Sequence, residues 1–321
     1  MLELKHAWSR RKQSGIFERT QALRVFHGAG EGQGDSRFFA VDRFGDHYWV
    51  TEWEGGLTAP RSNAQLTQIV EFLKTLGAQS VVGLSRPEKG VAPEAKTFWG
   101  NPPSGRFEVH ENQLKFWIQL GNTRHPGLFL DHEPLRRWLV GNVRGLKVLN
   151  AFAYTGSLSV ASGYGGARHI TTLDLSQPSI RWANENAKLN NIEDARCRWI
   201  AGDVFEWLPR LKREKESYDC IILDPPSFSR GNKGRFSTSK DLPALHSLAM
   251  ELLTPEGLLI TSINSANLNW KKYEADVLEA ATAKKMRFRI QRTIDLPETF
   301  PTLLGDESSR YLKGWILQRV G

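Results

Sequence analysis

Residues 147–156 read Lys-Val-Leu-Asn-Ala-Phe-Ala-Tyr-Thr-Gly, and this stretch decides the fold. Its apolar, β-branched start predicts a buried strand, and the break at Gly156 predicts a tight turn that leads into a helix. Three more apolar strands are expected over 169–173, 196–201 and 218–223, with helical patterns between them. Strands that alternate with helices predict a parallel sheet covered on both faces.

The three later strands each lead to an aspartate, and these acids indicate a ligand site. Asp174, Asp203 and Asp224 follow the strands, and in parallel sheets ligands bind at the carboxyl ends of the strands. We expect Asp174 to accept hydrogen bonds from ribose hydroxyls, Asp203 from an amine such as that of adenine, and Asp224 from an amino group or an acceptor base. Gly156 would let the backbone approach the ligand closely. A ligand with a ribose, a purine and a cationic end fits such an edge.

Two of these acids also have a structural interpretation. Asp174 could cap the helix that follows it, and Asp203 could cap the helix that begins at Val204. Ser176 is itself a natural helix N-cap. The position at a strand end nevertheless favours ligand binding for Asp174.

A dinucleotide-binding oxidoreductase is the competing class of enzyme. It needs a G-x-G-x-x-G run after the first strand, to hold pyrophosphate at the helix N-terminus. Residues 151–156 contain a single glycine, and the chain has no G-x-x-x-x-G-K-[ST] run. The sequence therefore gives little support to phosphate binding at this turn.

Four runs resemble motifs of a known family. Residues 150–156, 174–176 and 224–228, the last reading Asp-Pro-Pro-Ser-Phe, resemble three motifs of class I S-adenosylmethionine-dependent methyltransferases. The run Gly-Leu-Phe-Leu-Asp-His at 127–132 makes the chain similar to the family of bacterial 23S ribosomal RNA methyltransferases that contains the 5-methylcytosine and N7-methylguanine large-subunit enzymes. The resemblance implies an α/β, Rossmann-like fold with a seven-stranded, mostly parallel sheet, S-adenosylmethionine as cofactor and 23S ribosomal RNA as partner.

The resemblance also implies which residues hold the cofactor. Phe129 and Asp131 would help to close the site, although plain packing explains Phe129 equally well. The full set of expected cofactor-binding residues is Phe129, Asp131, Asn150, Phe152, Tyr154, Thr155, Gly156, Asp174, Ser176, Asp203, Val204 and Asp224.

The expected catalytic residues are Asp224, Pro225, Pro226 and Phe228. The two prolines fix the backbone and present carbonyls with no N–H to compete. The aspartate and a proline carbonyl could accept hydrogen bonds from the N–H edge of a base, and Phe228 could stack on that base. Transfer from a sulfonium methyl then mainly requires the alignment of acceptor, methyl and sulfur, and the exclusion of water.

A missing thiol narrows the choice of methylated atom. The 5-methylcytosine branch of the family uses a cysteine nucleophile after the next strand, but here the strand 257–262 continues to Asn264 without one. Cys220 lies inside a strand and is misplaced for this role. A nitrogen such as guanine N7 is therefore favoured over cytosine C5. Methylation of a protein or small molecule, and RNA binding without catalysis, are the alternative functions.

Basic residues beside the site indicate contact with RNA. The formal net charge is +8, which suits a polyanionic partner. Arg230, Lys233 and Arg235 stand in a glycine-punctuated loop, which is expected to be either a lid that grips RNA or a flexible solvated loop. Asn264 is expected to contact the base or to form a turn at the end of its strand.

Three parts of the chain are expected. Residues 1–20 form a basic segment, interpreted with equal weight as a solvated face or an RNA contact. Residues 21–120 form a small α+β domain that is expected to bind RNA, with a proline-rich linker or excursion at 87–104. Residues 121–321 form the methyltransferase domain. The basic residues of the first segment are Lys5, Arg10, Arg11, Lys12 and Arg19.

The protein is expected to be cytoplasmic. Cys197 and Cys220 fall in expected buried strands, as small core residues rather than a disulfide or a metal pair. No metal site is expected. Neither the start of the chain nor any later stretch has the apolar length of a signal peptide or a membrane span, so no membrane partner is expected.

Overall fold

The computed structural model describes residues 1–52, 59–84, 95–121, 125–226, 228–231, 234–264 and 268–320. The chain divides into two compact units. The N-terminal unit comprises Met1–Glu133 together with Leu296–Arg310, and the C-terminal unit comprises Pro134–Asp295 and Tyr311–Gly321. A segment from late in the sequence therefore belongs to the first unit.

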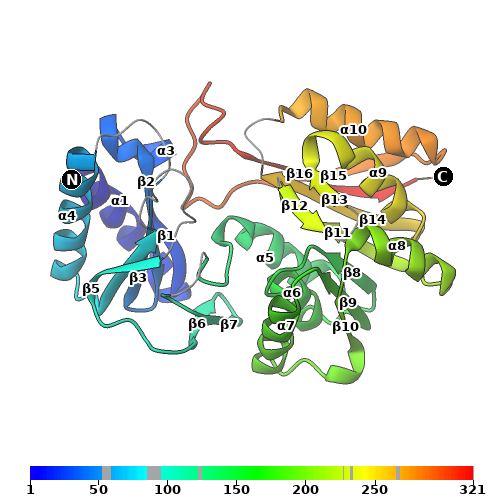
Figure 1. Ribbon diagram of the computed structural model, residues 1–321, viewed down its shortest axis with the longest axis horizontal. Coiled ribbons are helices and arrows are strands. Elements are labelled where there is room, and N and C mark those ends of the chain that lie inside the picture. Colours follow the sequence, from blue (N-terminus) through cyan, green and yellow to red (C-terminus); the bar gives the residue numbers. More distant parts are fainter. Residues whose placement is uncertain are drawn as a thin grey trace. The chain divides into compact units, whose positions relative to one another are not determined.

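A seven-stranded mixed sheet forms the centre of the C-terminal unit (Figure 1). Its strand order is β10-β9-β8-β11-β14-β16-β15. The pairings from β10 across to β14 are parallel, and β16 runs antiparallel to both of its neighbours. Because β8 lies between β9 and β11, the connections change direction there, and open α/β sheets bind ligands at such a point. The strands are β8 (Lys147–Ala151), β9 (His169–Asp174), β10 (Cys197–Ala201), β11 (Tyr218–Leu223), β14 (Leu253–Asn264), β15 (Phe288–Thr293) and β16 (Leu312–Arg319).

Helices cover both faces of this sheet (Figure 1). On one face, α8, α9 and α10 supply Leu208, Leu245 and Val277 to the apolar core. On the other face, α6 and α7 pack against β8, β9 and β10. These elements follow the predicted alternation of strands and helices. The helices are α5 (Glu133–Asn142), α6 (Ser157–Tyr164), α7 (Gln177–Leu189), α8 (Val204–Arg213), α9 (Thr238–Met250) and α10 (Trp270–Ala283).

The N-terminal unit contains a five-stranded sheet of order β1-β2-β3-β4-β5. Leu4 from α1 and Leu73 from α4 pack with Val41 of the sheet in its apolar core. Strands β6 (Phe107–Glu111) and β7 (Leu114–Ile118) pair as a separate hairpin. The other elements are α1 (Leu2–Gln13), α2 (Ile16–Arg19), β1 (Ala22–His27), α3 (Gly28–Glu31), η1 (Gly34–Phe38), β2 (Phe39–Phe44), β3 (His47–Glu52), α4 (Ala59–Thr75), β4 (Ser80–Leu84), β5 (Ala95–Gly100) and η2 (Leu130–His132).

Strand β5 lies within the stretch 87–104 that was expected to be a linker or an excursion, and for the residues of β5 that expectation is wrong. The strand pairs antiparallel with β4, with Val82 opposite Thr97; residues 85–94 lie outside the described residues. β5 is at the edge of its sheet and is largely exposed along its length. An edge strand of this kind has no alternation of buried and exposed residues, so the sequence pattern could not show it.

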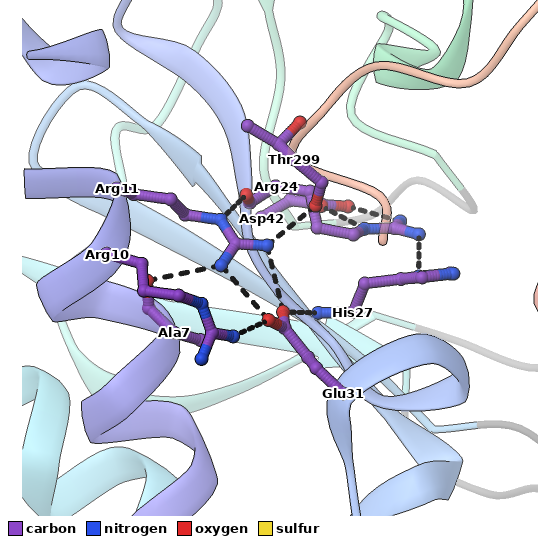
Figure 2. Close-up of polar contacts among 8 residues, drawn as sticks. All are labelled: Ala7, Arg10, Arg11, Arg24, His27, Glu31, Asp42 and Thr299. Atoms are coloured by element: carbon purple, nitrogen blue, oxygen red, sulfur yellow. Dashed lines mark hydrogen bonds and ion pairs between the residues drawn. The ribbon is translucent and has the colours of Figure 1, made fainter. Parts of the chain in front are cut away.

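The basic N-terminal helix contributes a buried charge to the unit. Arg11 is only 6% exposed, and its guanidinium donates to both carboxylate oxygens of Glu31, at 2.8 and 3.2 Å. It also donates to three backbone carbonyls, one of them that of Thr299. Figure 2 shows how these groups surround the guanidinium. For Arg11, the expectation of a solvated face or an RNA contact is therefore wrong, because these bonds occupy its N–H groups inside the protein.

A second buried ion pair adjoins the first (Figure 2). Arg24 donates two hydrogen bonds to the carboxylate of Asp42, at 2.8 and 3.1 Å. Its guanidinium also lies 4.2 Å from the centroid of the Phe300 ring, close enough for a cation–π interaction. Thr299 and Phe300 belong to the segment 296–310. Arg11, which donates to the Thr299 carbonyl, and Arg24, which lies over the Phe300 ring, therefore hold this late segment in the N-terminal unit.

Removal of Glu31 should therefore destabilise the protein. In Glu31→Ala the buried Arg11 loses its counter-charge, and we expect the free energy of unfolding to fall by about 3 kcal/mol. Chemical denaturation measures the change. The exposed pair of Arg19 and Glu298, 3.9 Å apart, supplies the control, since Glu298→Ala should cost less than about 0.5 kcal/mol. Equal losses in the two variants would contradict a special role for the buried pair.

A buried imidazole in α9 makes stability depend on pH. His246 is fully buried; its Nδ1 lies 2.8 Å from the carbonyl oxygen of Leu242, and its Nε2 lies 2.7 Å from Oγ1 of Thr261. Burial lowers the pKa of His246 to about 4. The folded protein therefore holds a neutral ring, in which Nδ1 donates to the carbonyl and Nε2 accepts from the hydroxyl.

The free energy of unfolding should consequently fall as the pH drops from 6.5 toward about 4, because the unfolded chain takes up a proton that the folded chain excludes. The expected slope is about 1.4 kcal/mol per pH unit. His27, whose pKa burial lowers to about 3, adds a dependence of the same sign. Denaturation at pH 7 and pH 5 measures the slope, which should be smaller in His246→Gln. The same slope in that variant would assign the effect to other groups.

Candidate active site

The turn after β8 has an unusual backbone conformation. Phe152, Tyr154 and Gly156 all have positive φ angles, of 60°, 50° and 74°. For residues other than glycine this left-handed conformation is uncommon, costs free energy, and is concentrated at functional sites. The predicted tight turn is therefore present, and it holds two strained residues in addition to the glycine.

Helix α7 determines the shape of this turn. A Cβ atom on Gly156 would lie 2.6 Å from Cβ of Ala183, so the glycine permits close packing of the turn against the helix. This close packing is a structural reason for glycine at position 156, in addition to the expected close approach of a ligand. From the same helix, Nδ2 of the fully buried Asn186 donates to the carbonyl of Thr155 at 2.9 Å. The sequence pattern did not single out Asn186, whose partner is 31 residues away in the chain.

Asp174 lies at the end of β9 and joins three elements. Its Oδ2 accepts the backbone N–H of Tyr154 at 2.8 Å, and its Oδ1 accepts that of Ser176 at 2.9 Å. Burial raises the pKa of Asp174, and these two hydrogen bonds oppose the rise. The hydroxyl of Ser176 caps α7 by accepting from the N–H of Ser179 at 3.2 Å. The carboxylate therefore shapes the turn and is also half-buried at the edge of the sheet.

Asp203 and Val204 follow β10. Asp203 is 8% exposed, and its Oδ1 accepts the N–H of Phe205 at 2.9 Å as the N-cap of α8. The helix-capping interpretation of this acid is thus present in the structure. Val204 is 3% exposed and packs in the apolar core. Asp203 nevertheless neighbours Asp174, because the N–H of Gly202 donates to the Asp174 carbonyl at 2.9 Å.

Asn150 lies inside the sheet rather than at its rim. It is 1% exposed, and its Nδ2 donates to Oγ of Ser159 in α6 at 2.9 Å. The same serine accepts a hydrogen bond from Oγ1 of Thr172, at 2.8 Å. These buried bonds tie β8, β9 and α6 together directly below the turn.

Asp224 lies immediately after β11 and is half-buried. Its Oδ1 accepts a hydrogen bond from Oγ of Ser262, in the neighbouring strand β14, at 2.6 Å. Pro225 is buried and Pro226 is exposed. Phe228 begins a short strand, β12 (Phe228–Gly231). The sequence pattern did not single out Ser262. Its role becomes visible only from the pairing of β14 with β11, which brings it next to Asp224.

The expected basic loop is a β-hairpin in the structure. Strand β12 pairs antiparallel with β13 (Gly234–Ser237), with Arg230 opposite Arg235. Lys233 lies outside the described residues. Asn264 is exposed at the end of β14, at the same edge of the sheet as Asp224.

Phe129 and Asp131 belong to the N-terminal unit. Phe129 is 41% exposed, and the centroid of its ring lies 5.2 Å from that of His125. Asp131 is 6% exposed, with Oδ1 3.1 Å from Nδ1 of His132. Their contact with a cofactor stays a prediction.

The part of the chain that the structure describes contains neither a group of possible metal ligands nor a helix that could span a membrane. No three His, Cys, Asp or Glu side chains there group as a metal site. None of the helices described has the length and apolar composition needed to span a bilayer.

A family model described as S-adenosylmethionine-dependent methyltransferase matches residues 23–306. The chain belongs to this family. One crystal structure, of a protein complexed with SAH, matches this methyltransferase with a TM-score of 0.88 and 27% identity, covering 98% of this chain and 80% of that one.

Two curated relatives are similar over most of this methyltransferase. Ribosomal RNA large subunit methyltransferase K of Neisseria meningitidis is 35% identical over 234 residues, which are 70% of this chain and 65% of that protein. Ribosomal RNA large subunit methyltransferase K/L of Pseudomonas aeruginosa is 34% identical over 244 residues, which are 74% of this chain and 32% of that protein. The methyltransferase therefore spans just under two thirds of the first relative and about one third of the second.

The cofactor is S-adenosylmethionine, and the groups at the edge of the sheet fit it. Asp174 ends β9 and Asp224 follows β11, the two strands that flank β8, and Asp203 follows β10, the strand beyond β9. Carboxylates therefore line the edge that would face a cationic sulfonium. Each oxygen of Asp174 accepts one backbone N–H, and a carboxylate oxygen has a second acceptor position for a ribose hydroxyl.

Substitution of two of these aspartates should distinguish binding from capping. Asp174→Ala should weaken the affinity for S-adenosylmethionine by at least about tenfold, the equivalent of one hydrogen bond to a charged group. Asp203→Ser keeps a helix cap and removes the charge, so the melting temperature should stay while affinity falls. Isothermal titration calorimetry measures both affinities. Unchanged affinity in Asp203→Ser would leave Asp203 as a cap alone.

Proposed function

We propose that this methyltransferase transfers a methyl group from S-adenosylmethionine to a base of large-subunit ribosomal RNA, at a ring or exocyclic nitrogen such as guanine N7. Both curated relatives are named as ribosomal RNA large subunit methyltransferases, which supports RNA as the substrate. The net charge of +8 suits a polyanionic substrate. The 23S RNA is the large-subunit RNA that the four sequence motifs imply.

The state of the two cysteines supports nitrogen over cytosine C5. Cys220 is fully buried in β11, and burial raises the pKa of its thiol to about 12. Cys197 is the first residue of β10, at the end of the strand away from the aspartates, and burial raises its pKa to about 11. Covalent attack on a pyrimidine needs a thiolate within reach of the base. A guanine nitrogen has its own lone pair and needs no nucleophile from the enzyme.

The proposed mechanism assigns alignment to the protein. When bound, S-adenosylmethionine supplies an electrophilic methyl group attached to a sulfonium. Asp174 and the turn 152–156 hold the ribose and the adjoining part of the cofactor. Asp224 accepts a hydrogen bond from an N–H on the base edge, and Pro225 and Pro226 restrict the backbone that follows it. Alignment of acceptor, methyl and sulfur, with water excluded, then supplies most of the rate enhancement.

Further RNA contacts are assigned to the elements beside this edge. We propose that Arg230, Lys233 and Arg235 contact the RNA backbone, and that Asn264 and Phe228 contact the base. Arginine and lysine bind phosphates, and an aromatic ring stacks on an unpaired base. The N-terminal unit is the proposed RNA-binding module, without the buried Arg11 as one of its contacts.

Methyl transfer to RNA from a strain that lacks this protein tests the proposal. Purified protein, labelled S-adenosylmethionine and that RNA should give one methylated nucleotide, located by mass mapping. A Cys197→Ala/Cys220→Ala variant should keep transfer within about threefold, since neither thiol takes part. Asp224→Ala should lower turnover by at least about tenfold, and by more than it lowers cofactor affinity.

Three outcomes would overturn parts of this proposal. Loss of transfer in the folded double cysteine variant would point to a thiol nucleophile and thus to pyrimidine carbon. Absence of label in the RNA, although S-adenosylmethionine binds, would refute the substrate class. Calorimetry that shows no binding of S-adenosylmethionine would refute the enzyme activity itself.

A further inference from the structure

Asp224 and Ser262 occupy matching positions on adjacent parallel strands. Strand β11 pairs with β14 in a register that sets Leu223 opposite Thr261, so the next pair along is Asp224 and Ser262. Side chains on a strand alternate between faces, and opposite residues of neighbouring strands share a face. The fold therefore brings the hydroxyl to the carboxylate although the two residues are 38 positions apart in the chain.

The hydrogen bond between them is short and part-buried. Oγ of Ser262 donates to Oδ1 of Asp224 over 2.6 Å, within the range for hydroxyl-to-carboxylate bonds. Ser262 is fully buried, whereas Asp224 is half-buried at the edge of the sheet. Ser262 therefore binds the carboxylate of Asp224 from the protein interior, while part of that carboxylate is exposed at the edge of the sheet. Hydrogen bonds to an ionised partner are stronger than those between neutral groups.

The strand that presents Ser262 is held firmly on its opposite face. Thr261, the preceding residue, accepts from the hydroxyl of Tyr273 at 2.9 Å and contacts Nε2 of His246 at 2.7 Å. Because Nδ1 of His246 donates to a carbonyl, its Nε2 is an acceptor. The Tyr273 hydroxyl therefore donates to Oγ1 of Thr261, and the Thr261 hydroxyl donates to Nε2 of His246. The Tyr273 ring also stacks on Trp315, with 4.9 Å between centroids and 4° between planes. Side-chain hydrogen bonds and packing therefore hold β14 in place beside Asp224.

We propose that Ser262 is a positioning residue, which fixes the orientation of the Asp224 carboxylate toward the acceptor base. This inference rests on the proposed function. A free aspartate side chain can rotate about two bonds, and a rotating acceptor would align the base for only part of the time. The bond to Ser262 fixes that rotation before the base arrives, which is the kind of preorganisation that raises turnover.

Single substitutions of Ser262 give the first test, with single-turnover methylation of RNA as the assay. Ser262→Ala should lower the methylation rate at saturating RNA by about tenfold, as expected for loss of one hydrogen bond to a charged group. The affinity for S-adenosylmethionine should stay close to that of the unmodified protein. Ser262→Thr keeps the hydroxyl and should restore most of the rate. Ser262→Cys keeps a weaker donor of similar size and serves if the threonine does not fold.

A double-mutant cycle separates positioning from general support of the core. If Ser262 acts through Asp224, Ser262→Ala should have no further effect in an Asp224→Ala background, so the two effects should be far from additive. Thr261→Val is the matched control, because it removes a buried hydroxyl from the next residue, on the other face of the strand. It should lower the melting temperature, and its effect on rate should add to that of Asp224→Ala.

The outcomes distinguish this inference from the proposed function. Full activity in Ser262→Ala, or additive effects of Ser262→Ala and Asp224→Ala, would overturn the role of Ser262 while methylation by the unmodified protein stands. Parallel losses of rate, cofactor affinity and melting temperature in Ser262→Ala, with no rescue by threonine or cysteine, would also overturn it and leave a purely structural serine. Absence of RNA methylation by the unmodified protein would refute the proposed function instead.

Discussion

The carboxylate of Asp174 sets the conformation on which the edge of the large sheet depends. It accepts the N–H groups of Tyr154 and Ser176, at 2.8 and 2.9 Å, and so joins the turn after β8, the end of β9 and the start of α7. Phe152 and Tyr154 have positive φ angles, which cost about 1 kcal/mol or more per residue. Such a backbone persists only where surrounding contacts hold it. The hydrogen bond from Asn186 and the packing of Ala183 restrain the turn further.

Burial separates the polar groups that build the molecule from those available to a ligand. Arg11 is nearly inaccessible, and its side-chain bonds end within the protein. Asp174 and Asp224 are half-buried, with part of each carboxylate engaged by the protein. A charged group in this intermediate position has its geometry fixed from the interior and can still meet a ligand. The sheet edge thus combines rigidity with access, as a site that works by alignment requires.

Alternation along β14 gives neighbouring hydroxyls different roles. Thr261 faces α9 and α10 and takes part in a buried network with His246 and Tyr273, whereas Ser262 faces Asp224. A strand turns successive side chains to opposite faces, so one residue can stabilise the core while the next holds a group of the site. In the N-terminal unit, a single side chain also connects several elements. The guanidinium of Arg11, in α1, bonds to β1, to α3 and to the segment 296–310.

The sequence by itself determined the local elements: four apolar strands, three of which lead to an aspartate, the glycine at the turn after the first, and the lack of a cysteine near Asn264. These follow from periodicity and from the backbone preferences of single residues, which act over a few positions. Tertiary structure alone decided that residues 296–310 pack in the N-terminal unit, that Arg11 is buried, and that Ser262 bonds to Asp224. The physical reason is that such contacts depend on which strands become neighbours. Strand order joins residues far apart in the chain, and no local pattern records it.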